Sequence, residues 1–200
     1  GENIHWLGVS FGDSIVPDQE TSLETIRQTI KQLGDSSHQN DDLLIVLIGH
    51  GSYLRGESKF QIPGEDLTSD ELNQLVTPLS FKRTVVVNTA SSSAGFINGL
   101  SQEGRIIVTA NKSVDETNAT EFMAFLVEAI ETGNADQNRD DRISLLECMN
   151  QAAKLTAFWY ETQGYMASEH SILEDNGDKR GTRWPIEMEF DHGDENKAEQ

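Results

Sequence analysis

Short apolar blocks alternate with polar and helical patterns along the first part of the chain, and four of these blocks predict strands. Each is a mostly apolar run rich in β-branched residues: Ile4–Val9, Leu43–Ile48, Thr84–Asn88 and Arg105–Ala110. The middle two runs, which contain LLIVLI and TVVV, are almost continuously apolar. This pattern is typical of strands that a parallel sheet buries on both faces, so we expect both of these strands to be buried in this way.

Two helices are predicted between these strands. The second begins at a capping box, Thr68 with Glu71, and runs through Val76. Strand and helix thus alternate, which predicts an α/β fold with a mainly parallel sheet and right-handed crossovers. The first helix has apolar residues at helical spacing and then a glycine where a C-cap is expected: Leu23, Ile26, Ile30, Leu33 and Gly34.

The last third of the chain has a different pattern. Two long helical patterns occupy residues 118–163, separated by the polar stretch GNADQNRDDR. We therefore divide the chain into an α/β core (1–117), a helical part of the same domain (118–186) and an acidic tail (187–200).

The polar stretch contains the clearest chemical motif, DQNRDDRISLLE, over residues 136–147. A calcium loop of the EF-hand type places oxygen ligands at positions 1, 3, 5, 7, 9 and 12, because Ca²⁺ takes about six to eight oxygens. We therefore predict a structural Ca²⁺ site in an EF-hand-like helix–loop–helix. Its ligands would be Asp136, Asn138, Asp140, the backbone carbonyl of Arg142, Ser144 and Glu147.

One position of this loop departs from the motif. Position 6 is normally a left-handed glycine, and here it is Asp141, a residue type that tolerates this conformation better than most. Ile143 at position 8 is expected to anchor the loop to the core. The alternative is a solvated acidic connection between two helices. A second acidic segment, LEDNGDKRG, lacks a full ligand set, and we interpret it as an Asn-Gly turn.

A second group of candidate residues follows the two central strands. The first of these strands runs into Gly49-His50-Gly51, and the next runs into a sequence that contains Ser91. Carboxyl ends of parallel strands are where α/β folds place their sites. An imidazole and a small nucleophile at adjacent strand ends are typical of acyl-transfer chemistry, with backbone N–H groups near Gly51 and Ser91 as a candidate oxyanion hole.

These motifs resemble the caspase-like peptidase clan, and legumain-type cysteine peptidases and their bacterial relatives in particular. In that clan a strand runs into His-Gly and a later strand into Asp-Ala-Cys-x-Ser-Gly. His50-Gly51 matches the first motif, and TASSSA at 89–94 maps onto the second with Ser91 at the cysteine position. The resemblance covers roughly residues 41–131 and implies a three-layer sandwich around a caspase-like sheet. It also implies a rim of a peptide pocket at Ala110, Asn111, Lys112 and Ser113.

The departures from the clan leave three functions open. Ser91 replaces the cysteine and Thr89 replaces the aspartate, which favours a peptidase-like domain that has lost catalysis. The second function is an active hydrolase, an endopeptidase that uses a His50–Ser91 dyad or a cysteine peptidase captured as a Cys→Ser variant. The third is a calcium-stabilised interaction module without peptidase function.

The charge and hydropathy of the chain exclude several classes of binding partner. The 200 residues include 15 Lys and Arg against 34 Asp and Glu, so the net charge of −19 argues against nucleic acid and anionic membranes as partners. No run of roughly 18 apolar residues occurs, so we expect no membrane insertion. Residues 131–200 hold 16 of the acidic groups, and the calcium loop accounts for part of this excess. The expected partner is a peptide or protein segment.

The remaining residues add little. The single cysteine, Cys148, excludes an internal disulfide framework, and its helical position makes it no substitute for the missing nucleophile. His170, beside Glu169, is expected to order the turn-rich region, with metal binding as the alternative. The first residues lack the basic and apolar regions of a signal peptide. The oligomeric state and the compartment stay open, with a periplasmic or secreted setting favoured because Ca²⁺ is plentiful there.

Overall fold

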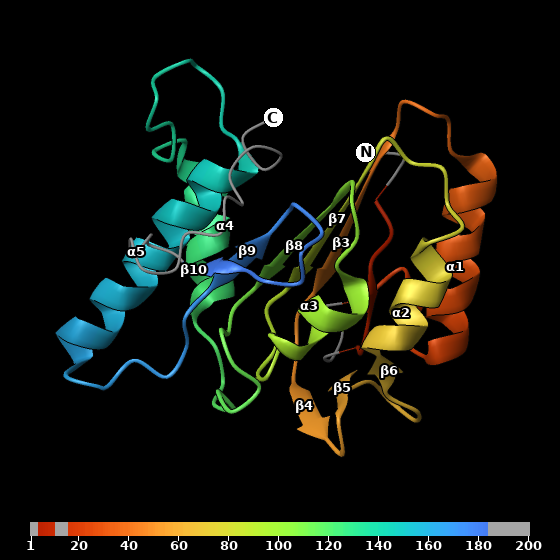
Figure 1. The fold of residues 1–200 in the computed structure, drawn as a ribbon, viewed down its shortest axis with the longest axis horizontal. Helices are drawn as coiled ribbons and strands as arrows, with labels where there is room; N and C mark the ends of the chain where they lie inside the picture. Colours follow the sequence, from red (N-terminus) through yellow and green to blue (C-terminus); the bar gives the residue numbers. More distant parts are fainter. Residues whose placement is uncertain (1–3, 11–15, 184–200) are drawn as a thin grey trace.

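A five-stranded mixed sheet organises the computed structural model, which describes residues 4–10 and 16–183 (Figure 1). β3, β7 and β8 are parallel, whereas β9 and β10 are antiparallel to their neighbours. The predicted α/β class is therefore confirmed, whereas the sheet, predicted as mainly parallel, is mixed and only partly parallel. In spatial order the strands are β10 (Thr182–Arg183), β9 (Ile172–Glu174), β8 (Arg105–Thr109), β7 (Arg83–Asn88) and β3 (Asp42–Leu47).

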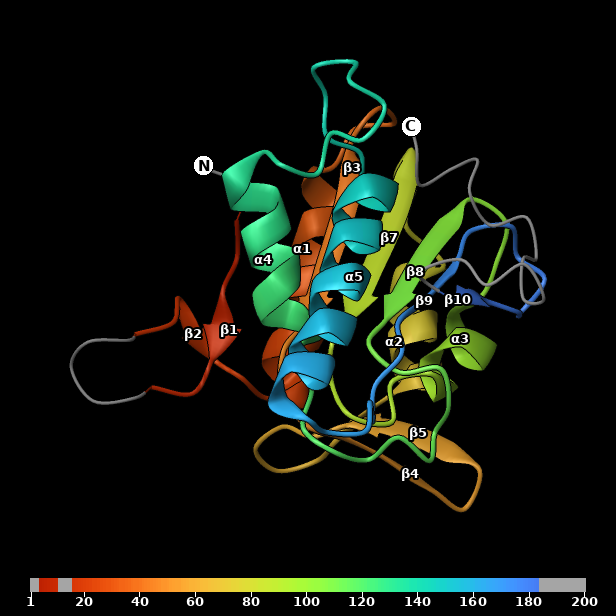
Figure 2. The ribbon, with the colours of Figure 1, turned by 90° about the vertical axis from the view of Figure 1, so that its left-hand side faces the viewer.

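Helices lie on both faces of this sheet (Figure 2). Because side chains alternate along a strand, Val86 of β7 belongs to one core cluster and Val87 to the other. None of the helices in the described residues is long and apolar enough to cross a membrane. The first face carries α1 (Leu23–Ser36), α2 (Ser69–Val76) and α3 (Gly95–Leu100), and the second carries α4 (Phe122–Thr132) and α5 (Leu145–Gln163).

The two predicted helix boundaries had different outcomes. The capping box of α2 is confirmed, since Glu71 N donates to Thr68 Oγ1 at 3.1 Å and Thr68 N donates to Glu71 Oε2 at 3.3 Å. The C-cap at Gly34 is wrong, because α1 continues to Ser36. A Cβ at Gly34 would lie 2.4 Å from Leu79 Cδ2, so this glycine makes room for a packed leucine instead.

The prediction for the first strand is wrong in extent. Only β1 (Leu7–Gly8) forms, and it pairs with β2 (Gln19–Glu20) in a separate parallel ribbon. β3 is therefore the last strand of the main sheet. α4 and α5 pack over β7, β8 and β9 and leave β3 uncovered on their side of the sheet. Three apolar side chains on this side of β3 are therefore exposed: Leu44 (61% exposed), Val46 and Ile48, the last just after the strand. Burial on both faces is consequently wrong for β3.

A second sheet, which the sequence did not predict, follows His50. It is antiparallel and consists of β4 (Gly51–Leu54), β5 (Glu57–Phe60) and β6 (Leu67–Thr68). Further along, α4 and α5 confirm the two long helical patterns. The predicted acidic tail at 187–200 lies outside the described residues.

Candidate functional site

The two loops that carry His50 and Ser91 lie side by side at the carboxyl edge of the sheet. β3 and β7 pair in parallel, with Leu47 opposite Asn88, and each strand ends at the loop in question. The end of β3 is also bonded directly to the second loop, since Thr89 N and Thr89 Oγ1 both donate to Leu47 O, at 3.0 and 2.9 Å. The structure therefore brings together the two loops that carry the residues that the sequence singled out.

The Ser91 hydroxyl is bonded to the Gly51 backbone. Ser91 Oγ accepts from Gly51 N at 3.2 Å and donates to Gly51 O at 3.1 Å. Ser91 is 5% exposed, whereas His50 is exposed and its imidazole makes no hydrogen bond within residues 4–10 and 16–183. The hydroxyl thus acts both as donor and as acceptor in its contact with the Gly51 backbone.

Gly51 permits this contact by its lack of a side chain. A Cβ there would lie 2.2 Å from the carbonyl oxygen of Ser91 and 3.3 Å from Ala90 Cβ. Neither Gly49 nor Gly51 has a positive φ. The requirement for glycine after His50 therefore comes from the close approach of the neighbouring loop.

Ser92 has a strained backbone next to the candidate nucleophile. Its φ of 54° lies in the left-handed region, which a serine rarely adopts. Ser92 N donates to Glu116 O at 2.8 Å, which fixes this conformation. Strain of this kind concentrates at functional sites. Ser92 Oγ is buried and has no hydrogen-bond partner in the described part of the chain.

The predicted rim, residues 110–113, is only half accessible. Ala110 and Asn111 are fully buried, and Asn111 Oδ1 accepts from Ser93 N at 3.4 Å and from Ser93 Oγ at 3.3 Å. Asn111 therefore holds the serine loop in place. Lys112 is exposed and Ser113 is half-buried, so only these two of the four predicted rim residues are accessible from solvent.

Sequence reasoning missed the partner of His170. Its Nδ1 lies 2.5 Å from Glu116 Oε1, and Glu116 Oε2 accepts from Lys112 N at 2.9 Å. Burial raises the pKa of Glu116, but the hydrogen bonds from His170 and Lys112 outweigh it, so the net pKa is lowered. His170 thus joins its own segment to the loop next to Ser92, a contact that neither of its two predicted roles specified. The partners are 54 residues apart, which left no local signal.

The predicted calcium loop connects α4 and α5. Asp141 has a φ of 62°, so the residue at position 6 adopts the left-handed conformation that the motif requires. The Asp136 carboxylate accepts from Asp140 N at 3.2 Å and from Asp141 N at 3.1 Å. Ile143 is 41% exposed, so its predicted role as a core anchor is wrong.

Glu147, at position 12, folds back across the loop. Its Oε1 accepts from Gln137 N at 2.8 Å and Asn138 N at 3.1 Å, and its Oε2 accepts from Ser144 N at 3.0 Å. Burial raises the pKa of Glu147, but these donors outweigh it and lower the net pKa. Within the described ranges, no three His, Cys, Asp or Glu side chains are grouped as a metal would require. The donor set is nonetheless rich in oxygen, which suits a hard cation.

The sequence comparisons with protein families and curated proteins give no match. No family model matches this chain, and no curated protein matches it in sequence.

Proposed function

We propose that this chain is a caspase- or legumain-like peptidase-fold domain with impaired catalysis, in which Ser91 stands at the position of the nucleophile. The observation that carries the proposal is the bonding of the Ser91 hydroxyl to the Gly51 backbone in place of His50. The strand order also supports it, since strand–His-Gly lies beside strand–Thr-Ala-Ser in parallel. Helices on both faces of the sheet fit the three-layer sandwich of that clan.

The impaired state follows from the chemistry of serine. A serine hydroxyl needs a histidine base that a carboxylate orients, whereas a cysteine thiol, with a pKa of about 8.5, supplies some nucleophile unaided. His50 has no such carboxylate partner among the described residues. Cys148 offers no substitute, because it is buried in α5 and burial raises the pKa of its thiol. The domain would then bind an extended peptide near Lys112 without cleaving it efficiently.

The test is the Ser91→Cys variant with a pooled library of fluorogenic peptides. We expect turnover about tenfold or more above that of the unmodified chain, because a few per cent of a thiol is ionised at neutral pH. Ser93→Cys is the matched control, since it places a thiol in the same loop at a buried position. If the unmodified chain turned over the peptides as fast as Ser91→Cys does, an active His50–Ser91 dyad would be favoured instead. Absence of turnover in every variant would overturn the peptidase account and favour an interaction module.

We also propose that residues 136–147 bind Ca²⁺ in a structural role. The left-handed Asp141 and the inward fold of Glu147 support this, because both belong to the loop geometry of the motif. The ligands would be the predicted set, which includes Asp136, Asp140 and Glu147. The ion would neutralise carboxylates that otherwise repel one another.

Thermal melting with and without Ca²⁺ tests the loop. At a free Ca²⁺ concentration about ten times Kd, binding adds about 1.4 kcal/mol, or roughly 3–6 °C in Tm. The Glu147→Gln variant keeps an acceptor for the loop N–H groups but loses the carboxylate, so we expect its shift to disappear. Glu128→Gln, on the exposed side of α4, should retain the full shift. An unchanged Tm for the unmodified chain on addition of Ca²⁺ or chelator would refute the site.

A further inference from the structure

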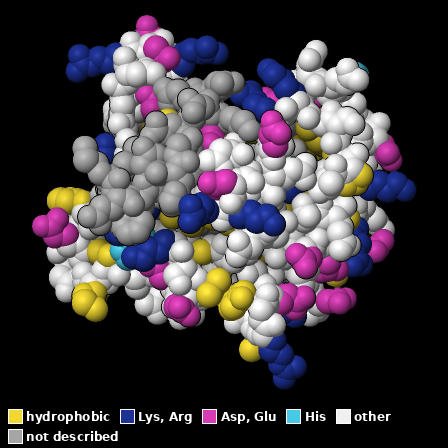
Figure 3. Space-filling view, in the orientation of Figure 1, with side chains coloured by type: hydrophobic (Ala, Val, Ile, Leu, Met, Phe, Trp, Pro, Cys, Tyr) yellow, Lys and Arg dark blue, Asp and Glu magenta, His cyan; other side chains and the backbone are white. Residues whose placement is uncertain are grey.

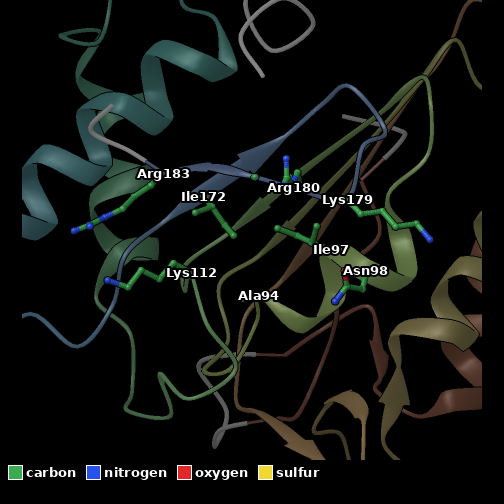
Figure 4. Close-up of a pocket in the computed structure, with 9 residues that line it drawn as sticks. Ala94, Ile97, Asn98, Lys112, Ile172, Lys179, Arg180 and Arg183 are labelled. Atoms are coloured by element: carbon green, nitrogen blue, oxygen red, sulfur yellow. The ribbon is translucent and has the colours of Figure 1, made fainter. Parts of the chain in front are cut away.

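A pocket of about 450 Å³ lies beside the serine loop, between the start of α3, the end of β8 and the β9–β10 hairpin. Figure 4 shows Ile97 and Ile172 facing each other in the middle of the pocket. Four basic side chains line it: Lys112, Lys179, Arg180 and Arg183. They are 4 of the 15 basic residues in a chain that carries 34 acidic ones.

The charge of this pocket is only partly balanced nearby. Lys179 and Arg180 form no salt bridge within the described residues. The carboxylate beside them, Asp178, is exposed, and its Oδ1 accepts from the backbone N of Arg180 at 2.7 Å. Glu116, near Lys112, is already engaged by its contact with His170. In Figure 3, Lys and Arg side chains lie near one another across the middle of this face.

The β9–β10 hairpin, which carries Lys179, Arg180 and Arg183, is fixed to the rest of the fold. Lys179 N donates to Ser101 Oγ at 3.1 Å, just after α3. The Asn-Gly turn predicted in this segment forms, with Gly177 at a φ of 83° and a Cβ position only 2.8 Å from Glu103 N. Gly181 likewise packs closely on Ile172. The pocket is therefore built from anchored segments.

The arrangement of the cations indicates the shape of the ligand. In Figure 4, Lys112 and Arg183 extend together on one side, whereas Lys179 extends on the other, with the two isoleucines between them. Cations that bind a compact anion converge on one point, and these diverge. An extended ligand with negative groups at both ends and an apolar middle fits this pattern.

We propose that this pocket binds an acidic segment of a partner polypeptide, with carboxylates on both sides of a central apolar residue. A peptide suits the extended pattern, and the net charge of −19 disfavours nucleic acid. The proposal does not rest on the function of Ser91 or His50, since neither residue lines the pocket.

Fluorescence anisotropy of the full chain with a dye-labelled Glu-Glu-Leu-Glu-Glu peptide tests the proposal. We expect saturable binding, and about tenfold weaker binding by the Lys179→Gln/Arg180→Gln variant, as two charge contacts imply. Lys31→Gln/Lys154→Gln is the matched control, because it removes the same charge from α1 and α5 and should bind as the unmodified chain does. The Gln-Gln-Leu-Gln-Gln peptide should not bind.

Three outcomes would overturn this proposal. The first is that the acidic peptide does not bind, or that the two double variants lose equal affinity for it. The second is tighter binding of a single-stranded oligothymidylate than of the peptide. The third is peptide binding that occurs only after the six carboxylates of residues 187–200 are neutralised, which would make the chain's own tail the occupant. Turnover by Ser91→Cys decides the proposed function separately, so the two proposals fail independently.

Discussion

Replacement of Gly51 by alanine is expected to lower the free energy of unfolding by about 3 kcal/mol, as overpacking against an immobile group does. The added methyl would lie 2.2 Å from the carbonyl oxygen of Ser91. That oxygen belongs to the backbone of a buried loop, so it cannot move aside as a flexible side chain would. The loop that follows β3 must then separate from the loop that follows β7, and the two hydrogen bonds between Gly51 and Ser91 are lost.

Urea unfolding measures this effect, and Gly49→Ala is the matched control. The Cβ of alanine at Gly49 would meet only the ring of Phe60, at 3.1 Å, and the ring can shift by a few tenths of an ångström. We therefore expect a loss of about 1 kcal/mol or less in the control. Similar losses for the two variants would show that the close approach of the loops is not what requires glycine after His50.

The local parts of this fold could be predicted from the sequence. β7 follows from an almost continuously apolar run and β8 from a mostly apolar one, and α2 follows from a capping box whose partners are three residues apart. The juxtaposition of the His50 and Ser91 loops also follows, because parallel strands deliver their carboxyl ends to one edge. In each case the interacting groups are close in the chain or are placed by the sheet itself.

The features of the fold and of the site that could not be predicted from the sequence depend on contacts between residues that are distant in the chain. α1 continues past Gly34 to Ser36, and Leu79, on another segment, fills the space that a side chain at Gly34 would need. The Ser91 hydroxyl is bonded to the backbone of Gly51, a residue 40 positions away in the sequence. The contact between Glu116 and His170 joins two loops with no periodic pattern. Such contacts leave no spacing that a single sequence could reveal.

A further distant contact holds the start of α4. No side chain caps this helix locally. Glu169 fills that place, since its Oε1 accepts from Glu121 N at 2.8 Å and its Oε2 accepts from Phe122 N at 3.2 Å. Glu169 is 4% exposed, so its carboxylate ties the segment before β9 to the helix on the second face of the sheet.

The Glu169→Ala variant should therefore lose about 3 kcal/mol of unfolding free energy in urea titrations, because it leaves a buried and a part-buried N–H group without an acceptor. Glu169→Gln keeps one acceptor oxygen in a side chain of similar shape, and we expect it to lose about half as much. Glu161→Ala, at an exposed position of α5, is the control and should change stability by less than about 0.5 kcal/mol.

The dependence of stability on pH distinguishes this role from simple packing. Burial raises the pKa of Glu169, and the N–H donors at the start of α4 offset the rise only in part. The folded state then binds more protons than the unfolded state between the ordinary carboxyl pKa and the raised one. The contribution of Glu169 is therefore largest below the ordinary value and falls as pH rises through the raised pKa. Glu169→Gln should lack this fall, so its deficit should shrink towards neutral pH; a deficit that stays constant with pH would contradict the assignment.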